Sequence, residues 1–172
     1  MAVRPILTAP DPRLKTVSAP VEAVDERVRA LVDDMFETMY AAPGVGLAAI
    51  QVGLPHRIVV MDLAEKEAPA DPKCFINPEV IWTSEDLATY EEGCLSVPEQ
   101  YADVARPAEA KVRYLDRDGI PQEMHARGLL ATCIQHEIDH LNGILFVDHL
   151  SSVRRSIILR KLAKAKRLAA AE

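Results

Sequence analysis

The chain lacks several features that mark special structural classes. It has only three cysteines among 172 residues, Cys74, Cys94 and Cys133, and none of them forms a Cys-x-x-Cys pair. A disulfide framework or a zinc ribbon is therefore not expected. No apolar run approaches the roughly 18 residues of a membrane helix, and the first ten residues lack the pattern of a secretory signal. We expect a cytoplasmic protein without a membrane partner.

The chain also has fewer basic than acidic residues. It contains 20 Lys and Arg and 26 Asp and Glu, which gives a net charge of −6 at pH 7. Nonspecific DNA binding needs a dominant basic surface, so DNA is not expected as a partner. The end of the chain differs in charge. Residues 151–172 contain seven Lys or Arg and one Glu, which gives this segment a net charge of +6 and leaves a net charge of −12 on the other 150 residues. We predict a basic, amphipathic helix over 151–172, packed through Val153, Ile157 and Leu162.

Length and composition predict a single domain over residues 1–172, since 49% hydrophobic and 27% charged residues are typical of globular proteins. Four prolines among the first twenty residues favour an irregular, extended arm. Apolar spacing and turn residues predict helices at 25–41 (capped by Asp25) and 128–142, and strands at 57–63, 74–82, 111–115 and 120–125. Because these elements do not alternate as β-α-β units, we expect an α+β fold of antiparallel strands around the 128–142 helix.

That central helix carries the sequence His136-Glu137-Ile138-Asp139-His140. Residues four apart lie on one helix face, so both imidazoles can reach one metal ion with Glu137 beside it. The alternative is a chance match on a polar face with solvated histidines. Burial of the helix favours the metal site.

A catalytic metal site usually has three protein ligands and one open position. One metalloprotease pattern places a third histidine downstream, but Phe146 stands there, and Asp148 is too close to His140. Cys133 is seven residues from His140, about 10 Å along the helix. Cys94, in the segment Glu92-Gly93-Cys94-Leu95-Ser96, is the better candidate. Taken alone, Cys94 would be interpreted as a small buried cysteine, and only the missing third ligand favours the metal role.

The segment Gly44-Val45-Gly46-Leu47-Ala48-Ala49-Ile50-Gln51 matches a dinucleotide-binding pattern, which must follow a strand and open a helix. Here a helix precedes it and a strand follows. We therefore interpret its glycines as positions where a substrate approaches the backbone, with Gln51 offering an amide donor.

In order and spacing, the segments 44–51, 92–96 and 135–140 resemble the three signature motifs of the peptide deformylase family. The likeness extends over essentially the whole chain, including the proline-rich start and the hairpin. It implies a hydrolase that removes the N-formyl group from the N-terminal methionine of newly synthesised polypeptides and releases formate. The resemblance also implies Fe²⁺ as the cofactor, with Zn²⁺, Ni²⁺ or Co²⁺ able to substitute.

The resemblance assigns roles by position. It implies Cys94, His136 and His140 as metal ligands, Glu137 as the catalytic acid, and Gln51 with the backbone N–H of Leu95 as donors to the oxyanion. The implied substrate-binding residues are Gly46 and Gly93 along the peptide backbone and Val45, Tyr90, Leu129 and Cys133 around the methionine side chain.

The residues support that chemistry. A metal ion would supply hydroxide at neutral pH to attack the formyl carbon. Glu137 would act as general base and then as general acid for the departing amine. Gln51 and the Leu95 N–H would stabilise charge on the formyl oxygen.

The sequence departs from the common family pattern at Tyr101, where an arginine is frequent, and at Thr132, where an apolar residue is frequent. These two departures leave open which residues after formylmethionine the protein prefers in its substrate. In some family members the C-terminal helix docks on the ribosome, which implies a ribosome contact through the basic helix. Two other functions stay open at this stage: a zinc peptidase that uses the same helix, and a noncatalytic ribosome-associated module of this fold.

Overall fold

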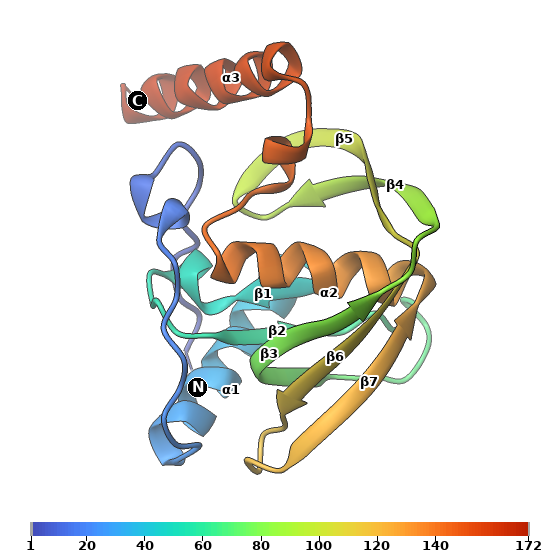
Figure 1. The fold of residues 1–172 in the computed structure, drawn as a ribbon. Coiled ribbons are helices and arrows are strands. Elements are labelled where there is room, and N and C mark those ends of the chain that lie inside the picture. Colours follow the sequence, from blue (N-terminus) through green and yellow to red (C-terminus); the bar gives the residue numbers. More distant parts are fainter. Residues whose placement is uncertain (1, 172) are drawn as a thin grey trace.

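A computed structural model describes residues 2–171, and Figure 1 shows the fold. The three helices described are α1 (Glu26–Ala41), α2 (Gly128–Leu141) and α3 (Ser152–Ala170). The strands are β1 (Gly46–Ala48), β2 (Ile58–Met61), β3 (Lys73–Thr83), β4 (Leu87–Cys94), β5 (Val97–Pro107), β6 (Glu109–Leu115) and β7 (Pro121–Arg127). The outer ends of the predicted domain 1–172 and helix 151–172 lie outside the described residues.

The strands form two antiparallel sheets. One has five strands in the order β1-β2-β3-β6-β7, and the other is the β4-β5 pair. Helix α2 runs between the two sheets (Figure 1). The expected α+β fold around this helix is confirmed, as is the hairpin of β6 and β7. None of the helices in residues 2–171 is both long and apolar enough to span a bilayer.

Helix α2 is central because it is apolar on more than one face. Ile134, Ile138 and Leu141 pack into a buried cluster with sheet residues that include Val59 and Phe75. The helix also contacts β4 and β5 on its other side. An element enclosed in this way loses its solvent, so its polar side chains need partners inside the protein.

Helix α1 covers the opposite face of the five-stranded sheet. Asp25 caps it as predicted, since the Asp25 carboxylate accepts a hydrogen bond from the N–H of Val28. Met35 and Met39 pack in one cluster with Val60 and other sheet residues. Because helices cover both faces, all four residues of β2 are buried, which explains its continuous apolar sequence.

The N-terminal segment is irregular, as predicted, apart from a short 3₁₀ turn at Pro12–Lys15. It is tied by backbone hydrogen bonds to segments far away in the sequence. The N–H of Leu7 donates to the carbonyl of Gln51, and that of Ala9 donates to Ser96. This arm therefore holds together two segments that carry candidate site residues.

Strands β1, β4 and β5 have no counterpart among the predicted strands. β1 has only three residues, too few for a pattern. In β4 and β5 the inward positions include Glu92 and Arg106, which pair with each other instead of packing as apolar side chains. The usual alternation of apolar and polar residues is therefore hidden.

The predicted packing of α3 is partly wrong. Ile158 and Leu162 are its buried residues, whereas Val153 is 68% exposed and Ile157 is 46% exposed. The helix docks through a narrow stripe against the cluster that contains Phe146. The sequence showed near-helical apolar spacing all along the helix, and the tertiary contact decided which positions were covered.

Candidate metal centre and active site

The three predicted metal ligands converge. One donor atom from each of Cys94, His136 and His140 lies within 4.8 Å of the others, and Cys94 Sγ is 3.3 Å from His140 Nε2. Within residues 2–171, these three side chains form the group of His, Cys, Asp or Glu residues that could hold a metal ion. Cys133 does not belong to it, as its distance along the helix predicted.

Local structure explains this convergence. His136 and His140 are one helical turn apart on α2, and their ring centroids are 5.1 Å apart. Cys94 is the last residue of β4, where a register shift after Glu92 interrupts pairing with β5. Such an irregularity bends the strand and redirects a side chain. It brings the thiol to the histidine face of α2.

A buried ion-pair network supports His136. Its Nδ1 lies 2.8 Å from Glu92 Oε1, and because a carboxylate accepts, Nδ1 carries the proton and leaves Nε2 free for a metal. The Arg106 guanidinium donates to both Glu92 oxygens at 2.7 and 2.9 Å, and to Asp139 at 2.8 Å. Burial raises the pKa of Glu92, but hydrogen bonds from His136 and Arg106 outweigh it and lower the pKa overall.

His140 is fully buried. Burial lowers its pKa well below the ordinary value. The imidazole is therefore neutral, the form that binds a metal. Its Nδ1 has no hydrogen-bond partner among the described residues.

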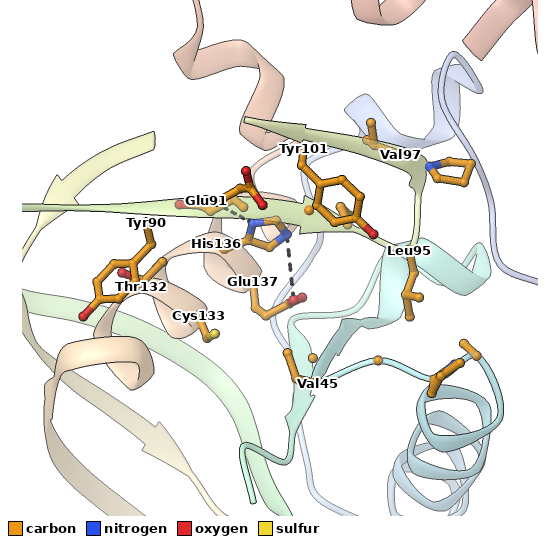
Figure 2. A pocket seen from close by; sticks show the side chains of 18 of the residues that line it. Val45, Tyr90, Glu91, Leu95, Val97, Tyr101, Thr132, Cys133, His136 and Glu137 are labelled. Atoms are coloured by element: carbon orange, nitrogen blue, oxygen red, sulfur yellow. Dashed lines mark hydrogen bonds and ion pairs between the residues drawn. The ribbon is translucent and has the colours of Figure 1, made fainter. Parts of the chain in front are cut away.

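Glu137 is 5% exposed and points toward the same space as His136 (Figure 2). Its Oε1 lies 4.0 Å from His136 Nε2, and its Oε2 has no partner among the described residues. Burial is the main cause that raises the pKa of this carboxyl to about 7. An unpartnered buried carboxylate oxygen is suited to accept a proton from a water or a substrate.

A cavity of about 600 Å³ lies in front of these groups (Figure 2). Its lining includes every residue that the sequence analysis assigned to substrate binding, and also Leu95, Glu137 and the candidate metal ligands Cys94 and His136. The substrate-binding candidates that line it are Val45, Gly46, Tyr90, Gly93, Leu129 and Cys133. Burial raises the pKa of Cys133 to about 12, so its thiol is neutral and serves as an apolar wall.

Gln51 lies next to Cys94, one of the candidate metal ligands. It is 1% exposed, and its amide nitrogen donates to Ser96 Oγ at 3.0 Å and to Cys94 Sγ at 3.5 Å. Its carbonyl oxygen accepts from the N–H of Ala48. The amide is therefore fixed with its N–H groups toward Cys94.

Two strand edges flank the cavity. β1 is the edge strand of the larger sheet, and β4 pairs only with β5. Gly46 of β1 and Gly93 of β4 both line the space between them. An extended peptide can pair with such exposed edges.

The sequence analysis gave no role to Glu92, Arg106 or Asp139. Glu92 is the first residue of the Cys94 segment, and metal-bound histidines usually donate to a carboxylate. That rule could have identified a buried acid near the ligands. Arg106 and Asp139 carried no such signal, because only the fold brings them to Glu92.

Comparison with known proteins gives consistent results. A family model described as "Polypeptide deformylase" matches residues 3–156. A protein named "Peptide deformylase" from Afipia carboxidovorans is 58% identical over 170 residues, 99% of each chain. One of the same name from Rhizorhabdus wittichii is 59% identical over 172 residues, 97% of each.

Solved structures agree with these sequence matches. The crystal structure of a peptide deformylase from Ehrlichia chaffeensis has a TM-score of 0.93 and 44% identity, and the match covers 98% of this chain and 99% of that one. A second structure of that enzyme, in complex with actinonin, has a TM-score of 0.93 and 46% identity, with 97% and 99% covered.

Proposed function

The chain belongs to the peptide deformylase family, hydrolases that remove N-formyl groups, and we propose how its own residues perform that reaction on new polypeptides. The substrate is a polypeptide that begins with N-formylmethionine, and the products are formate and a free amino terminus. The observation that carries the proposal is the convergence of Cys94, His136 and His140 beside the unpartnered carboxylate of Glu137.

The donor set fits a divalent metal. One thiolate and two imidazoles suit iron, cobalt, nickel and zinc, and three protein ligands leave a position for water or substrate. The buried Nδ1–carboxylate contact of His136 is the support that metal-bound histidines usually have. We assign Fe²⁺ as the native ion from the family resemblance, with zinc, nickel or cobalt as substitutes.

Glu137 moves the proton. When bound, the metal lowers the pKa of water and polarises the formyl carbonyl. The free Oε2 of Glu137 takes a proton from the attacking water and later delivers it to the amine nitrogen as the C–N bond breaks. Because the site is buried, little bulk water competes for this proton.

Two donors stabilise the charge that develops on the formyl oxygen. The Gln51 amide is held by Ala48 and Ser96 and faces Cys94. The backbone N–H of Leu95 follows Cys94 directly in the chain. A fixed donor of this kind typically contributes about 3 to 4 kcal/mol to the transition state.

The peptide lies between the strand edges of β1 and β4, where Gly46 and Gly93 let its backbone approach. Its methionine side chain enters the part of the cavity that is enclosed by Val45, Tyr90, Leu129 and Cys133. The neutral thiol of Cys133 is compatible with an apolar thioether.

We assign the whole of residues 1–172 to one catalytic domain and place it in the cytoplasm, where new polypeptides are made. The exposed basic face of α3 supports a ribosome contact, because Arg160, Lys161 and Lys164 point away from the buried stripe. Such a contact would be electrostatic and weaken with salt.

Formate release from formyl-Met-Ala-Ser tests the proposal, using protein prepared without oxygen and with its metal content measured. The expected result is rapid release with about one metal ion per chain. Bound metal without formate release would overturn the proposed function. Cleavage of unformylated peptides would then indicate a peptidase.

A further inference from the structure

Tyr101 has an unusual position at the mouth of the active-site cavity. Its side chain is 64% exposed, yet its ring lies against the backbone of Gly93. A Cβ at position 93 would stand 2.5 Å from Cε1 and 2.6 Å from Cδ1 of the tyrosine. The glycine of β4 and the tyrosine of β5 therefore form one continuous surface.

Strand alternation places this surface opposite the methionine site. Tyr90 and Glu92 face inward from β4, whereas Glu91 faces outward and is paired in register with exposed Asp103 of β5. Tyr101 is exposed on the same outward side of β5 as Asp103. Side chains of an extended peptide alternate in the same way. With methionine directed inward, the next side chain points to the outward face that carries Tyr101.

The surroundings of Tyr101 are acidic. Among the residues that line the cavity there is no Lys or Arg, whereas Glu91 and Glu99 are exposed there and form no ion pair among residues 2–171. The charge of Glu92, by contrast, is matched by Arg106. An aromatic ring beside two unpaired carboxylates attracts cations and flat apolar groups and repels anions.

We propose that Tyr101, with Glu91 and Glu99, selects the residue that follows formylmethionine, favouring a basic or aromatic side chain over an acidic one. This inference rests on the proposed function, because that function sets the direction of the peptide. The contact is made mainly when the peptide binds, so it changes KM more than kcat.

The test compares kcat/KM for four amidated peptides, formyl-Met-X-Ser with X as Lys, Phe, Ala or Glu. The wild-type protein is expected to prefer Lys over Glu by about fivefold to tenfold and Phe over Ala by about twofold to fivefold. The preference for Lys falls as salt rises, and the preference for Phe does not.

Variants separate the two contributions. Tyr101→Ala removes the Phe preference, Tyr101→Phe keeps it, and Tyr101→Arg shifts the charge preference toward Glu. The double variant Glu91→Gln with Glu99→Gln reduces the Lys preference and keeps that for Phe. Leu87→Ala is the matched control, since Leu87 is also 64% exposed on the same small sheet but lies outside the cavity lining; its ratios stay as in the wild type.

Equal kcat/KM for all four peptides, or ratios unchanged in Tyr101→Ala and Tyr101→Arg, would overturn the inference and leave the proposed function intact. No formate release from any of the four peptides would overturn both.

Discussion

Gly46 lies directly against Glu137. A Cβ at position 46 would stand 2.7 Å from Oε1 and 3.1 Å from the carboxyl carbon of that side chain. The edge of β1 and the proposed proton carrier on α2 are therefore packed so closely that any side chain at position 46 would force the carboxylate to shift.

A methyl group at Gly46 should displace this carboxylate. Gly46→Ala is expected to lower kcat by about 10²-fold, the usual cost of moving a reacting group by 1 Å, with unchanged metal content. Gly44→Ala is the control, because its methyl group would meet only the end of the Leu95 side chain, which can move. An equal loss in both variants would contradict the specific contact with Glu137.

Glu137→Gln tests the proton carrier itself. The amide has nearly the same shape but cannot accept the proton, so formate release should fall by about 10²- to 10⁴-fold. The metal ligands are untouched, and the metal content should match that of the wild type. Turnover near the wild-type rate would show that another group moves the proton.

Glu92→Gln tests the support of His136. The variant removes the charge that pairs with Arg106 and weakens the acceptor at Nδ1, so metal affinity should fall by about 10- to 100-fold. Competition with a chelator measures this affinity. Glu85→Gln, an exposed acid beyond β3, should have no effect. Equal affinities in both variants would argue against the network.

Asp148 makes stability depend on pH. Burial raises its pKa, but Lys15 at 2.6 Å and the N–H of Leu145 outweigh this and lower it below the ordinary 3.8. A lowered pKa means that the folded state favours the ionised carboxylate. The stabilisation of the folded state by the ionised Asp148 is complete well above pH 3.8. It is lost as the pH falls through the lowered pKa of the folded protein.

Asp148→Asn should therefore lower the free energy of unfolding by about 1 kcal/mol near neutral pH. The difference from the wild type should shrink on acidification below the ordinary pKa. Urea titrations at a series of pH values measure this. Asp118→Asn, in the exposed turn between β6 and β7, is the matched control. A constant difference for Asp148→Asn at every pH would exclude the charge as its cause.

The ribosome contact is tested best by charge reversal. Deleting residues from 160 onward would also remove buried Leu162 and disturb the fold. The triple variant Arg160→Glu, Lys161→Glu and Lys164→Glu changes only exposed positions and should abolish salt-sensitive co-sedimentation with ribosomes. Lys66→Glu, on an exposed loop, is the control. Unchanged co-sedimentation of the triple variant would remove the proposed contact.

Much of the site could be predicted from the sequence because its parts are local. His136, Glu137 and His140 share one helical turn, and helix geometry alone places them together. Cys94 was inferred because the helix supplied only two ligands. The fold class followed from the order of elements, and hairpin β6-β7 followed from its turn residues.

Other features depend on contacts between segments far apart in sequence. Arg106 is 14 residues from Glu92 and 33 from Asp139, yet it joins both. Strands β4 and β5 were not predicted, because two of their inward side chains, Glu92 and Arg106, are charged and pair with each other. The buried residues of α3 were set by the cluster around Phe146 against which the helix packs.

The sequence by itself determined the helix that carries two candidate metal ligands and the α+β class, because short-range periodicity encodes them. Only the tertiary structure decided that Tyr101 lies on Gly93, that Gly46 confines Glu137, and that a buried arginine supports the candidate ligand His136 through Glu92. These relationships arise from packing between separate elements, and the spacing of residues along the sequence does not determine such distances.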